Sequence, residues 1–255
     1  LPLVKKRILI DIRKFPKIFD IETPYGYGGP FSTTRDPSFI KLASKAFMEW
    51  CLKNNIVSSL IKFNPLLNNQ DLFSENINKI INRKIITINL SESKNLNEIF
   101  TPKILNLNRR VKKDNITINI ENSSSEIQNF FNIYLKNMKR KKANQFYFFN
   151  ENYFKNLKKI VDKNGYFITA RLEKKMIGAS IFLNFNNNSN YYLSSVSDGF
   201  KHPGVSSSII VKGAEIGIKN KIKTINLGGG NSNSDDDSLY LFKKRIGNNK
   251  KNFYI

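Results

Sequence analysis

Residues 205–244 have the sequence VSSSIIVKGAEIGIKNKIKTINLGGGNSNSDDDSLYLFKK, which sets out four structural elements in order. The hydrophobic spacing predicts a helix over 205–219, a strand over 224–227, the glycine loop 228–230 and a short helix that ends at Lys244. Consecutive glycines allow backbone conformations that other residues avoid, and they leave space for a ligand beside the chain. A flexible turn without a ligand is the alternative interpretation of these glycines.

Around this segment, the second half of the chain alternates strands and helices. Ser123 and Glu126 form a capping-box pattern that predicts a helix start, and Gly165 lies at the C-terminal cap position of a second helix. The predicted order is β-α-α-β-β-β-α-β-α-β. The expected strands are 116–121, 166–172, 176–185, 191–196, 224–227 and 252–255. One expected helix starts at the capping box, and the others span 151–164, 205–219 and 239–244.

The first half is predicted to repeat the tail of the same order. The expected elements are strand 3–12, a glycine-rich loop, helix 36–55, strand 57–63, a short helix near 71–82 and strand 85–90, with a helical linker over 96–113 that is interrupted at Thr101 and Pro102. We therefore expect two copies of one α/β (α+β) fold. The first copy, truncated at its N-terminus, occupies 1–114 with the linker, and the second occupies 115–255. The chain opens at Leu1 without a Met, so a preceding segment is also expected.

The glycine-rich loop of the first half reads DIETPYGYGGPF over residues 20–31. Its glycines allow close backbone approach, and its two tyrosines offer flat apolar faces that carry a hydroxyl. Asp36 and Pro37 then predict a helix start, where backbone N–H groups and the positive end of the helix dipole meet. The loop therefore predicts an anion-binding site. A tight turn with two packing aromatic residues is the alternative.

Composition limits the classes of protein. The formal net charge of +22 suggests nucleic acid or an anionic membrane as a partner, but the excess is spread along a chain that is also rich in Asn and Ile, so a compositional bias explains it equally. Cys51, the only cysteine, is predicted to be a core thiol on a helix face with Phe39, Ala43, Ala46, Phe47 and Trp50. One cysteine excludes an intrachain disulfide and fits a cytosolic setting, while the single His202 cannot anchor a typical zinc site. No apolar stretch is long enough for a membrane span.

Several short motifs follow one another along the chain. They are PYGYGGP at 24–30, FNPLL at 63–67, FYFF at 146–149, YYL at 191–193, LGGG at 227–230 and DSL at 237–239 followed by FK at 242–243. The order of the predicted elements resembles the GCN5-related N-acetyltransferase (GNAT) fold. The ordered motifs resemble the FemA/FemB/FemX-related branch of acyltransferases from about residue 20 to residue 247. Each motif is weak alone, and the ordered set is specific.

This resemblance implies a tandem GNAT-like fold whose first domain binds the acceptor and whose second domain binds the acyl donor and performs the chemistry. In the Fem pattern the lysine of the Phe-Lys pair contacts the donor and stabilises charge, which assigns this role to Lys243. A solvated basic helix end is the alternative for Lys243. Asp237 is expected to cap a helix, with proton acceptance as a second role. The other expected site residues are, for the donor, Ser206, Ser207, Gly228, Gly229, Gly230 and Phe242 and, for the acceptor, Tyr25, Gly26, Tyr27, Gly28, Gly29, Arg35 and Tyr192.

The resemblance also implies transfer of an acyl or aminoacyl group to an amine of a cell-envelope precursor, such as a muropeptide or a nucleotide-linked or lipid-linked amino sugar. The loop 202–208 lies where acetyltransferases hold the pyrophosphate of coenzyme A, yet it keeps only Gly204, so acyl-CoA and aminoacyl-tRNA both stay open as co-substrates. We expect no tightly bound cofactor and no metal. The expected partners are an anionic or lipid-linked acceptor, tRNA and, through a peripheral contact, a membrane, but not DNA. The expected location is the cytoplasm. A nucleic-acid-binding protein and a catalytically silent GNAT-like scaffold are the alternatives.

Overall fold

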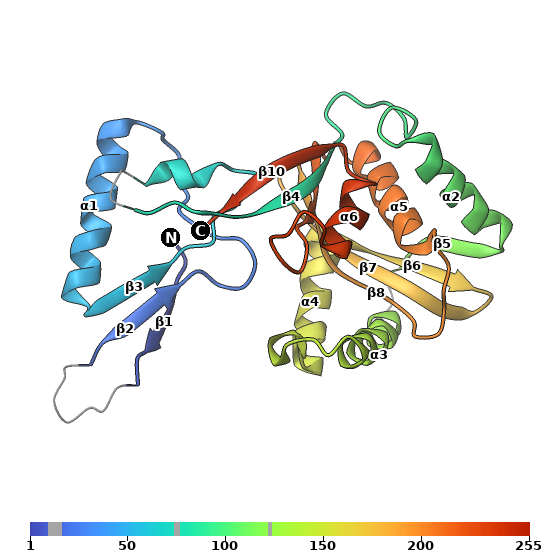
Figure 1. The fold of residues 1–255 in the computed structure, drawn as a ribbon, viewed down its shortest axis with the longest axis horizontal. Coiled ribbons are helices and arrows are strands. Elements are labelled where there is room, and N and C mark those ends of the chain that lie inside the picture. The colour runs from blue at the N-terminus through green and yellow to red at the C-terminus, as the bar shows by residue number, and fades with distance from the viewer. Residues whose placement is uncertain (10–16, 74–76, 122–123) are drawn as a thin grey trace. The chain divides into compact units, whose positions relative to one another are not determined.

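The computed structural model describes residues 1–9, 17–73, 77–121 and 124–255. Two compact units are present (Figure 1). Unit 1 consists of Leu1–Ile85, Ser232–Ser234 and Lys251–Ile255, and unit 2 consists of Ile86–Asn231 and Asp235–Lys250.

Unit 2 is built on a seven-stranded sheet with the order β10-β4-β9-β8-β7-β6-β5. Strands β5 to β8 form an antiparallel meander, β8 and β9 are parallel, and β9 pairs antiparallel with β4. The strands are β4 (Ile81–Asn89), β5 (Ile116–Glu121), β6 (Gly165–Leu172), β7 (Lys175–Phe185), β8 (Asn188–Val196), β9 (Thr224–Gly228) and β10 (Asn249–Tyr254).

Helices cover both faces of this sheet. The helices of unit 2 are α2 (Pro102–Lys113), α3 (Ser124–Arg140), α4 (Glu151–Asn164), α5 (Val205–Lys219) and α6 (Ser238–Lys244). Successive residues of β6 point to opposite faces of the sheet, so Phe167 packs with α3 and α4, whereas Ile168 packs with α2 and α5. This explains why β6 and β7 are nearly continuous runs of buried residues.

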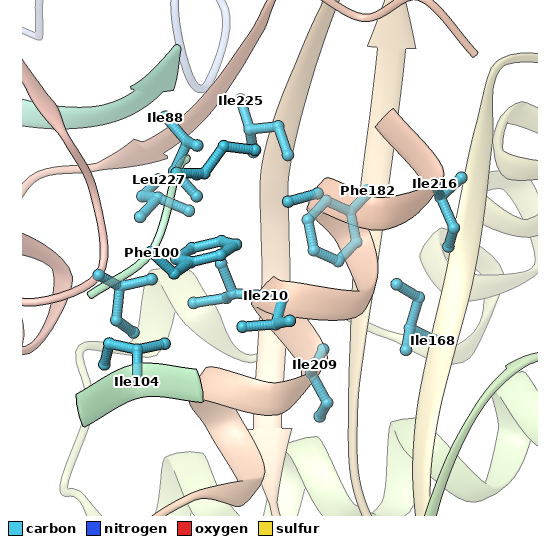
Figure 2. Packing of buried hydrophobic residues seen from close by; sticks show 14 of the residues in the cluster. Ile88, Phe100, Ile104, Ile168, Phe182, Ile209, Ile210, Ile216, Ile225 and Leu227 are labelled. Atoms are coloured by element: carbon cyan, nitrogen blue, oxygen red, sulfur yellow. The ribbon is translucent and has the colours of Figure 1, made fainter. Parts of the chain in front are cut away.

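The core beneath α5 is closely packed (Figure 2). Ile209, Ile210 and Ile216 of α5 share this cluster with Ile168 and Phe182 of the sheet. A Cβ atom on Gly213 would lie 2.6 Å from the ring of Phe182, so only glycine allows this helix to approach the sheet so closely.

Unit 1 has a three-stranded sheet of order β1-β2-β3, with β1 at Val4–Arg7, β2 at Phe19–Glu22 and β3 at Ile56–Leu60. Strands β2 and β3 are parallel and are joined through α1 (Pro37–Lys53). The core of this unit is small and centres on Ile61, Phe63 and Phe73.

Most of the predicted elements are confirmed, and α4 and α5 have the predicted bounds. The expected helix over 71–82 is wrong: a 3-10 helix, η1 (Asn69–Leu72), is followed by backbone that pairs at Ile80 with Ile255. Helix α2 starts at Pro102 rather than at residue 96, because a proline at the first helical position has no N–H to bond back to the preceding turn. Residues 10–12 of the expected strand 3–12 and Ser123 of the capping box lie outside the described residues.

The division of the chain differs from the expected boundary after residue 114. It falls between Ile85 and Ile86, because β4 pairs with β9 and α2 packs on α5, which ties residues 86–114 to the sheet of unit 2. The last five residues return to unit 1, where the backbones of Phe63 and Ile80 bond to Tyr254 and Ile255.

Helix α1 is less buried than its sequence pattern predicts. Cys51 is buried, as expected, and burial raises the pKa of its thiol. Phe39, Ala43, Ala46 and Trp50 were expected to lie in the core, but they are exposed, because unit 1 places little structure against this helix. Neither α1 nor any other helix in the described part of the chain is long and apolar enough to cross a membrane.

Candidate functional site

The sheet of unit 2 opens between β8 and β9. These parallel strands pair at only three positions, the last being Asn190 with Asn226. Beyond it, β8 continues along β7 to Val196 and β9 continues along β4 to Gly228. The Nδ2 atom of Asn226 donates to Oδ1 of Asn190 at 3.1 Å, and the Oδ1 of Asn226 accepts from the N–H of Gly228 at 2.8 Å. The two asparagines therefore close the ladder at the point where the strands part.

The loops that follow β8 and β9 lead away from one edge of the sheet, since the carboxyl ends of adjacent parallel strands lie together. The first loop leads into α5 and the second into α6. This edge therefore brings together Ser206 and Ser207, Gly228 to Gly230, and the residues of α6. Of these residues, the sequence had assigned the two serines, the three glycines and Phe242 to donor binding, and Lys243 to catalysis.

The side chain of Lys243 is buried at this edge of the sheet. Only 8% of Lys243 is exposed, and its Nζ donates to the carbonyl oxygen of Gly229 at 2.7 Å. The neighbouring Lys244 is exposed, and Phe242 packs against the core. A buried ammonium group acts through a low local dielectric, where it stabilises nearby negative charge more strongly than at a solvated helix end. The structure therefore does not support the alternative of a solvated basic end for Lys243.

Asp237 is the N-cap of α6, as predicted. Its Oδ1 accepts from the N–H of Tyr240 at 2.9 Å, and its Oδ2 accepts from the N–H of Asn231 at 3.0 Å. A Cβ atom on Gly230 would lie 2.4 Å from Oδ1 of Asp237, so the third glycine of the loop is needed for this contact. Gly228 has φ +76, a conformation that favours glycine. The glycine loop is thus a fixed support for Asp237 and Lys243.

This geometry separates the two roles predicted for Asp237. Asp237→Asn keeps an oxygen that can accept from Tyr240 but turns its NH2 group toward the N–H of Asn231, so stability should fall by less than in an alanine variant while turnover stays near that of the wild type. Asp237→Ala removes the cap and should cost about 0.5–2 kcal/mol of stability, with lower activity. Parallel melting curves and turnover measurements distinguish the roles. A stable but inactive Asn variant would show that the carboxylate takes part in proton transfer.

Tyr192, predicted on the acceptor side, lies on β8 two residues beyond the last pair with β9. The β7–β8 register shifts at this point, since Ile181 opposes Leu193 while Phe182 opposes Tyr191. The hydroxyl of Tyr192 lies 2.5 Å from that of Tyr153 on α4. Burial raises the pKa of the Tyr192 phenol, and the bond to Tyr153 partly offsets this, so the phenol is neutral near pH 7 and does not serve as a base.

The start of α5 carries no side-chain cap. Ser207 Oγ donates to the carbonyl oxygen of Gly204 at 2.9 Å, and Nδ1 of His202 accepts from the N–H of Gly204 at 3.1 Å. Nε2 of His202 lies 3.0 Å from Asp114, so in the neutral ring this nitrogen carries the proton. The only glycine of the loop 202–208 thus uses its N–H within the protein. No set of three or more His, Cys, Asp or Glu side chains that could hold a metal occurs in the described ranges.

The glycine-tyrosine loop of unit 1 has a structural explanation. Buried Asn69 donates from Nδ2 to the carbonyl oxygens of Gly28 at 2.8 Å and Pro30 at 3.0 Å, and its Oδ1 accepts from the N–H of Asn64 at 2.8 Å. Gly29 has φ +96, and a Cβ atom on it would lie 2.6 Å from Nδ2 of Asn69. The glycines therefore allow the backbone of the loop to pack closely around the side chain of Asn69.

Three of the N–H groups that were predicted to bind an anion are used by the protein itself, and an anion site at the rest of the loop stays a prediction. The N–H of Gly28 donates to the carbonyl oxygen of Lys62 at 2.7 Å, and Asp36 accepts from the N–H groups of Ser38 and Phe39. Hydrogen bonds from Ser38 lower the pKa of Asp36, so a negative charge occupies this helix start.

The other predicted acceptor residues are spread over unit 1. Tyr27 packs edge-on against Phe253 with ring centroids 5.1 Å apart, whereas Tyr25 is exposed. Arg35 donates to the carbonyl oxygen of Leu67 at 2.9 Å. Gly26 has φ +95 and open space around it. An acceptor role for these residues stays a prediction.

No protein-family model matches this sequence, and no curated protein matches it. Solved structures do match. The structure of FemX superposes with a TM-score of 0.68 at 13% identity, covering 99% of this chain and 88% of that one. L-PGS from Bacillus licheniformis gives a TM-score of 0.66 at 13% identity, covering 99% and 80%. The C-terminal DUF2156 domain of a candidate lysylphosphatidylglycerol synthetase from Agrobacterium fabrum gives 0.67 at 13% identity, covering 92% and 76%.

At this level of identity the similarity concerns the fold. The chain has the mixed α/β fold of FemX and L-PGS, and the resemblance to the FemA/FemB/FemX-related proteins is confirmed at that level. The expected α/β (α+β) fold class is thereby confirmed, and the interpretation of unit 1 as a truncated copy of the fold of unit 2 stays a prediction. The asparagine pair and Asn69 were not identified from the sequence, since neither lies in a motif and the chain is rich in asparagine.

Proposed function

We propose that the protein is an acyltransferase that moves an aminoacyl group from an aminoacyl-tRNA to an amine of a cell-envelope precursor. The observation that carries the proposal is the opening between β8 and β9 beside the buried ammonium group of Lys243. An extended acyl donor fits where two strands part, because the backbone groups on both sides are no longer bonded to each other. The fold of FemX and L-PGS supports the same class of reaction.

The proposed chemistry needs stabilisation of a tetrahedral oxyanion and of the leaving oxygen. Lys243 supplies a fixed positive charge for this, with Gly229 holding its ammonium group. Asp237 positions the helix that carries Lys243, and the glycine loop holds Asp237. The neutral phenol of Tyr192 can donate to the acceptor or to the acyl carbonyl.

Acyl-CoA is the second candidate donor. The start of α5 has no side-chain cap, which leaves a positive helix end for a phosphate. We prefer the tRNA donor because Gly204, the one glycine of the loop 202–208, is not available to a pyrophosphate. Its N–H donates to His202, and the backbone of α2 lies against it, since a Cβ atom on Gly204 would be 3.0 Å from the carbonyl oxygen of Leu107.

The test is mass spectrometry of a pool of cell-envelope precursors after incubation with aminoacyl-tRNA or with acyl-CoA. We expect a mass increment of one amino acid with the tRNA donor, and at least about tenfold slower formation of this product with a Lys243→Met variant. An increment with acyl-CoA alone would establish the second donor. No increment with either donor, together with tight saturable binding of duplex DNA at physiological salt, would favour the nucleic-acid-binding alternative.

A further inference from the structure

Helix α1 of unit 1 presents an apolar stripe to solvent. Only Ser44 and Cys51 of the helix are buried, and Phe47 packs on Phe73 with ring centroids 5.6 Å apart. An adjoining side of the helix carries five exposed residues at the spacing i, i+3, i+4, i+7 and i+11, which we call the α1 stripe. Its members are Phe39, Leu42, Ala43, Ala46 and Trp50.

The exposure of the stripe is large for apolar side chains. Leu42 is 67% exposed, Phe39 is 49% exposed and Trp50 is 42% exposed. Single exposed apolar residues are ordinary, but a stripe that runs over three helical turns marks an interaction surface. Val57 and Leu60, on the edge strand that follows the helix, are exposed as well.

The same helix carries exposed cations. Lys41, Lys45 and Lys53 are exposed, and the only acidic residue within α1 is Glu49, whose Oε1 lies 4.0 Å from Nζ of Lys45. The helix therefore has two net positive charges, three lysines less one glutamate. Lysine stems lie along apolar surface while their ammonium groups stay in water, and an anionic surface attracts them.

We propose that α1 docks on the surface of a lipid bilayer that contains anionic lipids, with the α1 stripe inserted at the level of the headgroups. Lys53 lies beside the stripe, three residues after Trp50, whereas Lys41 and Lys45 lie on the opposite side of the helix. Tryptophan and phenylalanine on one side of a helix with lysine on the other are typical of helices that lie in this interface. A second copy of the chain fits the surface less well, because two equal patches would bring their lysines together and lysine is depleted from interface cores. This inference rests on unit 1 alone and does not depend on the proposed chemistry, although it would hold the protein where lipid-linked acceptors lie.

The chain offers a direct probe, because Trp50 of the stripe is its only tryptophan. On mixing with vesicles of phosphatidylcholine and phosphatidylglycerol, Trp50 emission should shift to shorter wavelength, and brominated lipids should quench it. Pure phosphatidylcholine vesicles should give a much weaker response, and added salt should weaken the response to the anionic vesicles. An unchanged spectrum with anionic vesicles would overturn the proposal.

Two variants separate charge from apolar insertion. Replacing Lys41, Lys45 and Lys53 by Gln should weaken partitioning about 100-fold, since each lysine near an anionic surface contributes about fivefold. Leu42→Ser should weaken it strongly with the melting curve unchanged, because this side chain is mostly in solvent. The matched control is Ile160→Ser, which removes an exposed apolar residue from α4 and should leave partitioning unaltered.

Two outcomes would contradict a bilayer partner. If Ile160→Ser reduced partitioning as much as Leu42→Ser, the binding would be nonspecific. If the Trp50 emission shifted with protein concentration in the absence of lipid, and sedimentation showed a dimer, the stripe would be the contact between two copies.

Discussion

Lys243→Met is expected to lower the turnover of the transfer reaction at least about tenfold, with the fold intact. The substitution keeps a long apolar stem in a buried position and removes the charge together with the hydrogen bond to Gly229. Since this charge acts mainly on the oxyanion and the leaving group, kcat should fall more than donor affinity does. Steady-state kinetics with varied donor concentration measures the two effects separately.

Lys244→Met is the matched control. It removes the same charge one residue further along α6, where the side chain is exposed, and turnover should stay within about twofold of the wild type because exposed charges are well screened. Lys243 also bonds to Gly229, so melting curves must accompany the kinetics. A folded Lys243→Met variant with normal kcat would remove this residue from the active site.

Asn69→Ala should destabilise unit 1 by about 3 kcal/mol or more. The asparagine makes three hydrogen bonds to the backbone of Gly28, Pro30 and Asn64, and its loss leaves one buried and two partly buried groups without this partner at about 1–3 kcal/mol each. Trp50 lies in unit 1 and is the only tryptophan, so its fluorescence in a denaturant titration reports on the unfolding of this unit.

The control for Asn69→Ala is Asn78→Ala, which replaces an exposed asparagine of the same unit and should change stability by less than about 0.5 kcal/mol. Equal midpoints for Asn69→Ala and the wild type would mean that the loop does not depend on this side chain. In that case the glycines would need another explanation, and binding of an acceptor would be the first to test.

Local patterns were sufficient to predict the elements of unit 2. Helix α4 has the predicted bounds because its apolar periodicity lies between the cap residues Asn150 and Gly165, and α5 has them because a largely apolar run lies between Gly204 and Asn220. The end of unit 1 could not be predicted in this way. It depends on the pairing of β4 with β9, and strands so far apart in the sequence leave no local signal of their partnership.

The candidate site was predicted unevenly for a similar reason. Lys243 and Asp237 came from a resemblance to ordered motifs, and the structure adds the burial of Lys243 and the cap made by Asp237. The predicted anion site loses two of its donors because Asp36, correctly identified as a cap, occupies the N–H groups of Ser38 and Phe39. The side chains of Asn190 and Asn226 meet only through the register of two parallel strands, which one sequence does not reveal.

The return of residues 251–255 to unit 1 bears on how the protein is synthesised. Residues 1–85 leave the ribosome before unit 2 is made, but the backbone partners of Phe63 and Ile80 and the ring that packs on Tyr27 are translated after it. Unit 1 must therefore wait, partly assembled, while the whole of unit 2 is made. Its exposed apolar residues are most open to aggregation or chaperone binding during this interval, so slow translation of residues 86–255 would reduce the yield of folded protein.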